Sequence, residues 1–351
     1  MPLRVLYLGE SWLGSCARAM REALQRRTDL IVDEVAEDHY FPRASSLGAR
    51  IARRLASQLH RGDFEREVLR RVDQFRPDLV VAYKGWCVVE PLLKQLSARQ
   101  VRTMNIYPDC SPHAHGPEHR KAVGGYDLIV SSKPYHPASW STTYGYSNEC
   151  VFVGQGYDPG LHLAGEPASE WVYDVVMIAT WRREYETFMR EFARLMDGKG
   201  VTVAIGGYGW PARADVLPRG WVLPGEVQGR SYVEWLRKGR ICIALMSRDM
   251  IVDGTPQPGD VDTTRTYELA AAACFFVHLR TAHVQGLYDE RTEVPMFESP
   301  SELAELVSTF RDADDDRMRF AVNAHARAVP HYSLDERARS IAGHMQKLTS
   351  S

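Results

Sequence analysis

The sequence predicts an α/β protein made of two doubly wound parallel sheets. Short apolar runs alternate with amphipathic segments along most of the chain, which is typical of parallel strands joined by helices. The alternation stops in a stretch rich in Gly and Pro between residues 154 and 168, and it then starts again. We therefore expect two Rossmann-like domains that face a cleft, over residues 1–155 and 170–332. A helix within 333–351 is expected to pack back on the N-terminal domain.

The first half of the chain supplies the elements of one such sheet. Near its start, Ala17, Met20 and Leu24 recur at spacings of three and four, which places them on one face of a helix. The third apolar run is almost continuous, as expected for a strand covered on both faces. The predicted strands are Arg4–Leu8, Leu30–Val35, Leu79–Tyr83, Val101–Ile106, Asp127–Ser131 and Glu149–Val153. The predicted helices are Trp12–Arg27, Ser45–Leu59, Phe64–Phe75 and Pro91–Ala98.

After the break, the same alternation predicts a second sheet. Its ligand-binding loops are expected at the carboxyl ends of the strands. Residues Asp253–Asp260 form a long polar loop in this pattern, and long loops in compact domains are often functional. The predicted strands are Asp174–Ile178, Val201–Ile205, Trp221–Leu223, Ile241–Leu245 and Cys274–His278. The predicted helices are Arg183–Met196, Tyr232–Lys238, Thr264–Ala273, Ser301–Phe310, Asp314–Val329 and Leu334–Leu348.

Composition and charge exclude several classes of protein. With 25% charged and 44% apolar residues, the 351-residue chain is typical of a globular protein. The longest uncharged apolar stretch, Leu269–Val277, is shorter than the about 20 residues that span a bilayer, and the start of the chain lacks the pattern of a signal peptide. We therefore expect a cytoplasmic protein without a membrane span. The net charge of −2 gives no whole-chain footprint for nucleic acid, and six cysteines without a Cys-x-x-Cys pair predict reduced thiols.

The most informative segment, residues 260–268, reads Asp-Val-Asp-Thr-Thr-Arg-Thr-Tyr-Glu and leads into a helix. Backbone N–H groups at a helix N-terminus attract anions, and Arg265 can grip phosphate oxygens in a fork. Glu268 can accept both hydroxyls of a ribose. The alternative is an ordinary capped helix, because threonine caps and an early Glu stabilise any helix. The candidate hydroxyl donors are Thr263, Thr264 and Thr266.

The segment Asp262–Glu268, followed by small apolar residues, resembles the nucleotide-sugar site of the CgeB-like (spore-maturation protein type) group 1 glycosyltransferases. The resemblance is strongest over residues 172–335. It implies the GT-B fold, with the donor held by the C-terminal domain. Asp260 and Glu268 are separated by seven residues, which is similar to the paired Glu-x7-Glu element of many retaining GT-B enzymes, although the first acid here is Asp. The resemblance therefore implies that Asp260 and Asp262 belong to the donor site.

A second segment of the expected donor site follows the strand Asp174–Ile178. In similar enzymes the loop after this strand approaches the donor phosphates. Two arginines at the start of the next helix oppose the helix dipole, which favours a bound anion over a merely solvated helix end. The candidate residues are Thr180, Trp181, Arg182 and Arg183.

A third segment ends the strand Val201–Ile205 in glycines with an aromatic residue between them. Glycine lets the backbone approach a ligand closely. The resemblance implies a wall of the nucleotide pocket, and a plain tight turn is the alternative. The residues are Gly206, Gly207, Tyr208 and Gly209.

In the first half, polar loops after the strands predict the acceptor site. Glu10, Ser11 and Trp12 follow the first strand, and an indole ring stacks well on sugars or aromatic rings. Alternatively, Ser11 is a helix N-cap. Lys84 follows the third strand and is a further acceptor-binding candidate, with simple loop chemistry as the alternative.

The segment Asn105–His115 collects a carboxylate and imidazoles after the fourth strand. Asp109 and His113 are the candidates for the general base that deprotonates an acceptor hydroxyl; in a retaining enzyme the departing phosphate takes this proton instead. The histidines lack the carboxylate or thiolate partners of a metal site, so we predict none.

Together these observations predict a metal-independent glycosyltransferase. Arg265, with Arg182 and Arg183, would neutralise the diphosphate of a nucleoside diphosphate sugar as it leaves. The nucleotide sugar is a co-substrate and no cofactor is expected. The acceptor, the sugar, the base, the stereochemistry and the oligomeric state stay open, with a small molecule, a glycan or a modified polymer as acceptor classes. The alternatives are a nucleotide-sugar epimerase and a non-catalytic nucleotide- or carbohydrate-binding protein. A missing Gly-x-Gly-x-x-Gly fingerprint disfavours a nicotinamide oxidoreductase.

Overall fold

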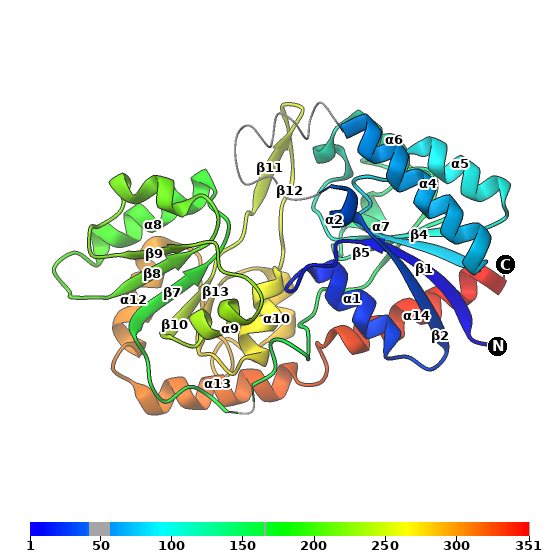
Figure 1. Cartoon of the computed structure of the whole chain (residues 1–351). Helices are drawn as coiled ribbons and strands as arrows, with labels where there is room; N and C mark the ends of the chain where they lie inside the picture. Colours follow the sequence, from blue (N-terminus) through cyan, green and yellow to red (C-terminus); the bar gives the residue numbers. More distant parts are fainter. Residues whose placement is uncertain (42–56, 165, 351) are drawn as a thin grey trace. The chain divides into compact units, whose positions relative to one another are not determined.

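The computed structural model describes residues 1–41, 57–164 and 166–350. The chain forms two units, each assembled from separate segments (Figure 1). Unit 1 comprises Met1–Gln155, Ile251–Pro258 and Leu334–Ser351, and unit 2 comprises Gly156–Met250 and Gly259–Ser333. Among the residues described, no helix has both the length and the apolar character that crossing a membrane requires.

Unit 1 is built on a parallel sheet with the strand order β2-β1-β3-β4-β5-β6. The first strand is internal, because Val5 pairs with Val32 on one side and with Leu79 on the other. The chain therefore adds strands in one direction from β1, and then reverses to add the rest on the opposite side. The strands are β1 Leu3–Gly9, β2 Leu30–Ala36, β3 Leu79–Tyr83, β4 Arg102–Tyr107, β5 Leu128–Ser131 and β6 Glu149–Phe152.

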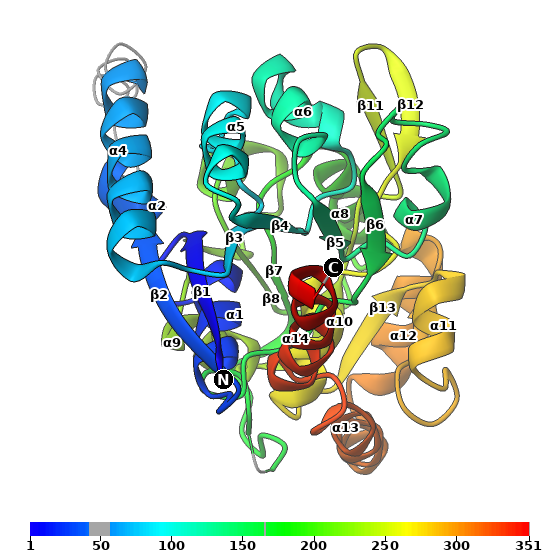
Figure 2. The same cartoon turned by 90° about the vertical axis from the view of Figure 1, so that its right-hand side faces the viewer.

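Both faces of this sheet are covered by helices. Successive strand residues point to opposite faces, so neighbouring residues of β1 join different apolar cores. Leu6 and Leu8 join the core beneath α4, α5 and α6, whereas Val5 and Tyr7 join the core beneath α1 and α14. The last helix thus packs beside the first one in the sequence (Figure 2). The helices are α1 Cys16–Gln25, α2 Glu37–Tyr40, α4 Ser57–Phe75, α5 Glu90–Ala98, η1 Pro112–His115, α6 Pro117–Val123, α7 His136–Ser139 and α14 Leu334–Ser350.

Unit 2 repeats this plan, with the parallel strand order β14-β13-β10-β7-β8-β9. Its first strand, β7, is again internal, and one apolar core surrounds the sheet. The strands are β7 Tyr173–Ile178, β8 Val203–Gly206, β9 Val222–Gly225, β10 Gly239–Ala244, β13 Phe276–Leu279 and β14 Met296–Phe297. The helices are α8 Arg183–Leu195, η2 Trp210–Val216, α9 Arg230–Leu236, α10 Thr264–Ala271, α11 Ala282–Leu287, α12 Pro300–Phe310 and α13 Asp314–Ala328.

The segment expected as a long polar loop is instead a β-hairpin, formed by β11 (Asp249–Val252) and β12 (Thr255–Pro258). Asp253 and Gly254 at its tip have φ of +50° and +76°, the conformation that a two-residue hairpin turn requires. Residues 251–258 belong to unit 1, where Asp253 pairs with Arg120 at 2.6 Å and the Tyr135 hydroxyl donates to the Pro258 carbonyl at 3.3 Å.

Other differences from the predicted elements are local. The first helix begins at Cys16 rather than at Trp12, because the Ser15 hydroxyl caps it by accepting from the Ala17 N–H at 3.1 Å. Ser45–Leu59 lies mostly outside the described residues, and the helix predicted over Phe64–Phe75 is part of the longer α4. Elements that the sequence pattern did not indicate are mostly short: α2, η1, α6, α7, η2, α11 and β14.

Candidate functional site

The sheet of unit 2 reverses its strand order between β7 and β10, which are hydrogen-bonded neighbours. In open parallel sheets, ligands bind outside the carboxyl ends of the strands at such a point. Thr180–Arg183 directly follows β7, and Leu245 directly follows β10. Two of the segments predicted to bind the donor therefore lie at the reversal point. One is Thr180–Arg183, and the other is the start of α10, which is bound to Leu245.

The anchor is Arg265 in the first turn of α10. Its Nη2 donates to the Leu245 carbonyl at 2.7 Å, which holds the guanidinium at the end of β10. Its Nε is buried and has no hydrogen-bond partner among the described residues. Buried donors in folded proteins are nearly always satisfied, so this Nε is free to donate to a group that reaches the end of β10.

Arg182 and Arg183 occupy the N-cap and the first position of α8. Both side chains are exposed, and neither forms an ion pair with any residue that the structure describes. Positive charge is unfavourable at a helix N-terminus, and a bound anion would offset this cost. Beside them, Thr180 is exposed, whereas the Trp181 indole donates to Glu186 at 2.9 Å and is partly covered by Arg213.

Several predicted donor residues instead shape the start of α10. Asp262 is fully buried, accepts a hydrogen bond from the Tyr267 hydroxyl at 2.5 Å and lies 3.6 Å from the His283 imidazole. The Thr266 hydroxyl is also fully buried and contacts His278 at 2.7 Å. Thr266 belongs to the capping box of α10, as the capped-helix interpretation expects, whereas Asp262 is bound by side chains. A role of either residue in donor binding stays a prediction.

The remaining predicted residues of this segment flank the same helix start. Thr263 is buried, and its N–H donates to the Thr266 hydroxyl at 3.0 Å, while Thr264 is half-buried. The half-buried Asp260 is placed by its own N–H, which donates to the Ser247 carbonyl at 2.7 Å. Asp260 therefore lies just beyond the end of β10.

The glycines after β8 have a packing explanation. Gly207 has φ of +130°, and a Cβ there would come within 2.0 Å of the Ala179 carbonyl oxygen. A Cβ on Gly209, with φ of +90°, would lie 2.9 Å from that of Trp181. Close approach between two loops of the protein thus requires these glycines, as the tight-turn alternative expects. A role of Gly206–Gly209 in the donor wall stays a prediction, with Tyr208 61% exposed beside them.

Unit 1 reverses its strand order between β1 and β3, and the predicted acceptor residues follow those two strands. The Trp12 indole donates to Glu10 at 2.8 Å, and the Ser11 hydroxyl contacts Asp38 at 3.1 Å. Ser15 supplies the cap of α1, so the N-cap interpretation of Ser11 is wrong.

Lys84, after β3, has a left-handed φ of +63°, which is uncommon for a residue with a side chain. Its ammonium group lies 2.8 Å from Asp109, and the His115 Nε2 contacts the same carboxylate oxygen at 2.6 Å. Burial acts to raise the pKa of Asp109, but the hydrogen bond with His115 and the charge of Lys84 outweigh it and hold this pKa well below its usual range. A carboxylate with so low a pKa is a weak proton acceptor.

The imidazole that contacts Asp109 belongs to His115, whereas His113 packs edge-on against Tyr144 with ring centroids 5.3 Å apart. Burial and the nearby Arg120 lower the pKa of His113. A lowered pKa favours the neutral imidazole, which is the form that accepts a proton. The assignment of either residue as the base stays a prediction. Within the described ranges, no cluster of three His, Cys, Asp or Glu side chains could hold a metal ion.

Comparison with known proteins connects this architecture to solved structures. Residues 182–343 match the model of a family described as "Glycosyl transferase-like". No curated protein sequence matches the chain. A sucrose-phosphate synthase from Thermosynechococcus elongatus superposes with a TM-score of 0.67 at 12% identity, covering 99% of both chains. Anabaena Alr3699/HepE, solved in complex with UDP and glucose, superposes with a TM-score of 0.64 at 12% identity, covering 98% of this chain and 100% of HepE.

The protein has the GT-B fold. A third structure, that of MnaA from S. aureus with UDP, superposes with a TM-score of 0.53 at 13% identity and covers 98% of this chain and 96% of MnaA. These superpositions at low identity establish the fold alone, and residues 182–343 resemble a glycosyltransferase-like family. The narrower resemblance to CgeB-like enzymes stays a prediction.

Within this GT-B architecture, two residues next to Glu268 were not indicated by the sequence. The Tyr232 hydroxyl donates to one oxygen of this buried carboxylate at 2.6 Å, and the His162 Nε2 lies 3.9 Å from the other. The His162 Nδ1 accepts from the Asp158 N–H at 3.1 Å, so the proton of a neutral ring sits on the nitrogen that faces Glu268. Both residues are far from Glu268 in the sequence, and no local pattern signals the contact.

Proposed function

We propose that the protein is a glycosyltransferase that moves a sugar from a nucleoside diphosphate sugar to an acceptor hydroxyl. The observation that carries this proposal is the set of three arginines at the ends of β7 and β10. Arg265 has an unsatisfied buried donor, and Arg182 and Arg183 form no ion pair with described residues. Such a set suits a diphosphate. The family match over residues 182–343 and the UDP-glucose complex of the structurally similar HepE support this interpretation.

In the proposed reaction, the acceptor oxygen forms a bond to the anomeric carbon as the bond from that carbon to the diphosphate breaks. Arg182, Arg183 and Arg265 stabilise the negative charge that develops on the leaving diphosphate. Glu268, held in place by Tyr232, accepts hydrogen bonds from the ribose hydroxyls. In an inverting course the acceptor proton passes to His113; in a retaining course it passes to the departing phosphate.

The proposal also includes the CgeB-like subtype, a metal-independent course and a cytoplasmic location. The resemblance of Asp262–Glu268 supports the subtype, and the cationic side chains supply the charge stabilisation that a metal ion provides elsewhere. If activity is abolished by EDTA and restored by a divalent metal, the metal-independent course is wrong.

The test is donor binding measured by calorimetry with a panel of nucleotide sugars that begins with UDP-glucose. Arg265→Ala and Glu268→Gln should each weaken binding of the preferred donor about tenfold or more, because a charge-assisted hydrogen bond contributes about 1.5–3 kcal/mol. The exposed Arg219→Ala in the same unit is the matched control and should bind like the wild type. Unchanged affinity in both site variants would refute the donor site.

Turnover separates the proposal from its nearest rival. A nucleotide-sugar epimerase would convert its donor without any acceptor. We expect NMR of the donor in the absence of acceptor to show only slow hydrolysis to free sugar and nucleoside diphosphate. A new epimeric nucleotide sugar in that assay would favour the epimerase.

A further inference from the structure

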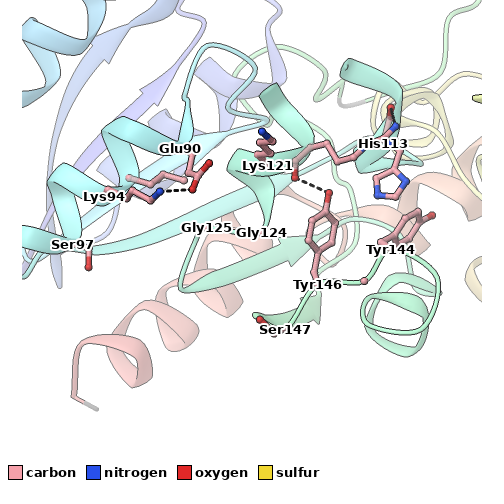
Figure 3. Close-up of a pocket in the computed structure, with 13 residues that line it drawn as sticks. Glu90, Lys94, Ser97, His113, Lys121, Gly124, Gly125, Tyr144, Tyr146 and Ser147 are labelled. Atoms are coloured by element: carbon pink, nitrogen blue, oxygen red, sulfur yellow. Dashed lines mark hydrogen bonds and ion pairs between the residues drawn. The ribbon is translucent and has the colours of Figure 1, made fainter. Parts of the chain in front are cut away.

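An open pocket of about 650 Å³ lies within unit 1, away from the reversal point of its sheet. Its walls come from α5, α6 and the loop Tyr144–Ser147, with His113 of η1 at one side (Figure 3). A volume of this size falls in the range of about 300–1,000 Å³ that small-molecule sites occupy. Apart from His113, the proposed reaction uses none of the residues that line it.

The pocket walls carry more positive than negative charge. Lys94, Arg120 and Lys121 line it together with one carboxylate, Glu90. Glu90 forms an ion pair with Lys94, with 2.6 Å between the ammonium nitrogen and the carboxylate oxygen. Lys121 is exposed, and its ammonium group forms no ion pair with the residues that the structure describes. The pocket thus offers a cation that still lacks a counter-charge.

Arg120 shows that a carboxylate fits at the edge of this pocket. Its Nη2 binds Asp253 from the tip of the hairpin at 2.6 Å and also donates to the His113 carbonyl at 3.2 Å. Asp253 belongs to the same unit, and its carboxylate is bound by the Arg120 guanidinium. The second contact fixes the guanidinium beside the His113 backbone.

The wall next to Arg120 is aromatic. The His113 ring packs edge-on against Tyr144 and Tyr146, with centroids 5.3 Å and 6.0 Å away. Both tyrosine hydroxyls are committed to backbone carbonyls, at 3.3 Å and 2.9 Å, so the rings are held in fixed positions. Rigid aromatic rings beside polar groups suit ligands with both an apolar face and hydrogen-bonding edges. A sugar ring has this character, because its C–H groups gather on one face and its hydroxyls lie at the edge.

We propose that this pocket binds an anionic saccharide, a sugar that carries a carboxylate or a phosphate group, and that this saccharide is one part of the acceptor, whose remainder lies against the loops after β1 and β3. Lys121 binds the anionic group beside the ion pair of Arg120 with Asp253, and the rings of Tyr144 and Tyr146 contact the sugar. The His113 imidazole, which lines the pocket, faces a hydroxyl of the saccharide. This inference rests on the proposed function only in naming the ligand as the acceptor.

The experiment measures binding of three probes by ligand-observed NMR: a glucuronate disaccharide, glucose 6-phosphate and the neutral disaccharide maltose. We expect at least one anionic probe to bind about tenfold more tightly than maltose, as a charged contact of this kind implies. The charge reversal Lys121→Glu should remove that preference. The exposed Arg66→Gln on α4 is the control and should keep it. Whichever anionic probe binds identifies the carboxylate or the phosphate as the preferred group.

Two further measurements separate this inference from the proposed function. Binding of the anionic probe should persist in Arg265→Ala, which excludes attachment at the donor site. UDP-glucose binding should be the same in Lys121→Glu as in the wild type. Equal affinity for charged and neutral probes, or an anionic preference that survives Lys121→Glu, would overturn the inference and leave the donor site untouched. If the wild type bound no nucleotide sugar, the proposed function would be wrong.

Discussion

The two sheets reverse their strand order at corresponding places, with β1 between β2 and β3 and β7 between β8 and β10. The side chains at these places differ in how their charges are satisfied. In unit 1, Lys84 and His115 are held by Asp109, and Ser11 is held by Asp38. In unit 2, the arginines that follow β7 form no ion pair within the described part of the chain.

This difference shows that topology determines where the ligand loops lie, whereas side chains determine which ligand they bind. The reversal of strand order places loops for ligands at the same edge of both sheets. An anionic diphosphate needs charge from the protein, whereas a hydroxyl group needs partners that are already fixed in position. Under the proposed function, the uncompensated arginines at the reversal point of unit 2 therefore mark the diphosphate site, and the internally paired groups at the reversal point of unit 1 mark the site of the acceptor hydroxyl.

The largest expected effect concerns Glu37, which follows β2 in unit 1. Its side chain is 1% exposed, and burial raises its pKa from 4.5 to about 8. The folded state keeps a proton that the unfolded state releases above pH 4.5, so stability is lost as the pH rises from there towards about 8. The loss should reach about 4–5 kcal/mol, at about 1.4 kcal/mol for each pKa unit.

Glu37→Gln should remove this pH dependence, because the amide stays neutral. We expect the free energy of unfolding of the variant, measured with urea, to change far less between about pH 5 and about pH 8 than that of the wild type. The exposed Glu118→Gln should keep the wild-type slope. If the free energy of unfolding changed with pH equally in the wild type and in Glu37→Gln, unit 1 would tolerate a charged Glu37 and the prediction would be wrong.

The second prediction removes the charge that distinguishes unit 2. The double variant Arg182→Ala/Arg183→Ala should lower kcat/KM for the donor about 100-fold, since two charge-assisted contacts contribute about 1.5 kcal/mol each at the low end. Its control is Arg190→Ala/Arg194→Ala, which removes two exposed arginines from the same helix. Steady-state kinetics with saturating acceptor would measure both. Similar losses in the two double variants would mean that the effect belongs to α8 and not to a bound diphosphate.

The sequence predicts the sheets better than it predicts the sites. Buried parallel strands are nearly continuous apolar runs, so the run Leu79–Tyr83 indicated its strand directly. The hairpin was missed although Asp253-Gly254 is a strong turn signal, because its flanking residues lack the alternation of a half-buried strand. The strand order itself, which locates both candidate sites, depends on pairing between distant segments.

Residues of the candidate sites were identified by type more reliably than by role. Arg265 contacts the end of β10, whereas Asp262 from the same motif is fully buried, and the donor-binding role of both stays a prediction. Spacing along a helix cannot show which side chains face inward when both faces carry polar groups. The contacts of Glu268 with Tyr232 and His162 join segments from different parts of unit 2, so no local pattern contains them.

The third prediction concerns Tyr232, a positioning residue for Glu268. Tyr232→Phe removes the 2.6 Å hydrogen bond to the carboxylate, which should weaken donor binding about tenfold. We expect the change in KM for the donor with kcat nearly unchanged, because the ribose contact is the same in ground and transition states. The buried Tyr185→Phe is the control, since its hydroxyl makes only a 3.4 Å contact to a carbonyl. A fall in kcat with unchanged KM would contradict the assignment.

The smallest predicted effect compares Ser11 with Ser15, two serines that flank the start of α1. Ser15→Ala removes the helix cap and should cost about 1 kcal/mol of stability with little effect on catalysis. Ser11→Ala keeps the hydrogen bond from the Ser11 N–H to Asp38, so it should cost only about 0.5 kcal/mol of stability. It should also raise KM for the acceptor about two- to threefold, which corresponds to about the same free energy. Urea unfolding and acceptor kinetics on both variants provide the comparison. If Ser11→Ala were the more destabilising change and left KM for the acceptor unaltered, the loop after β1 would serve the fold and not the acceptor.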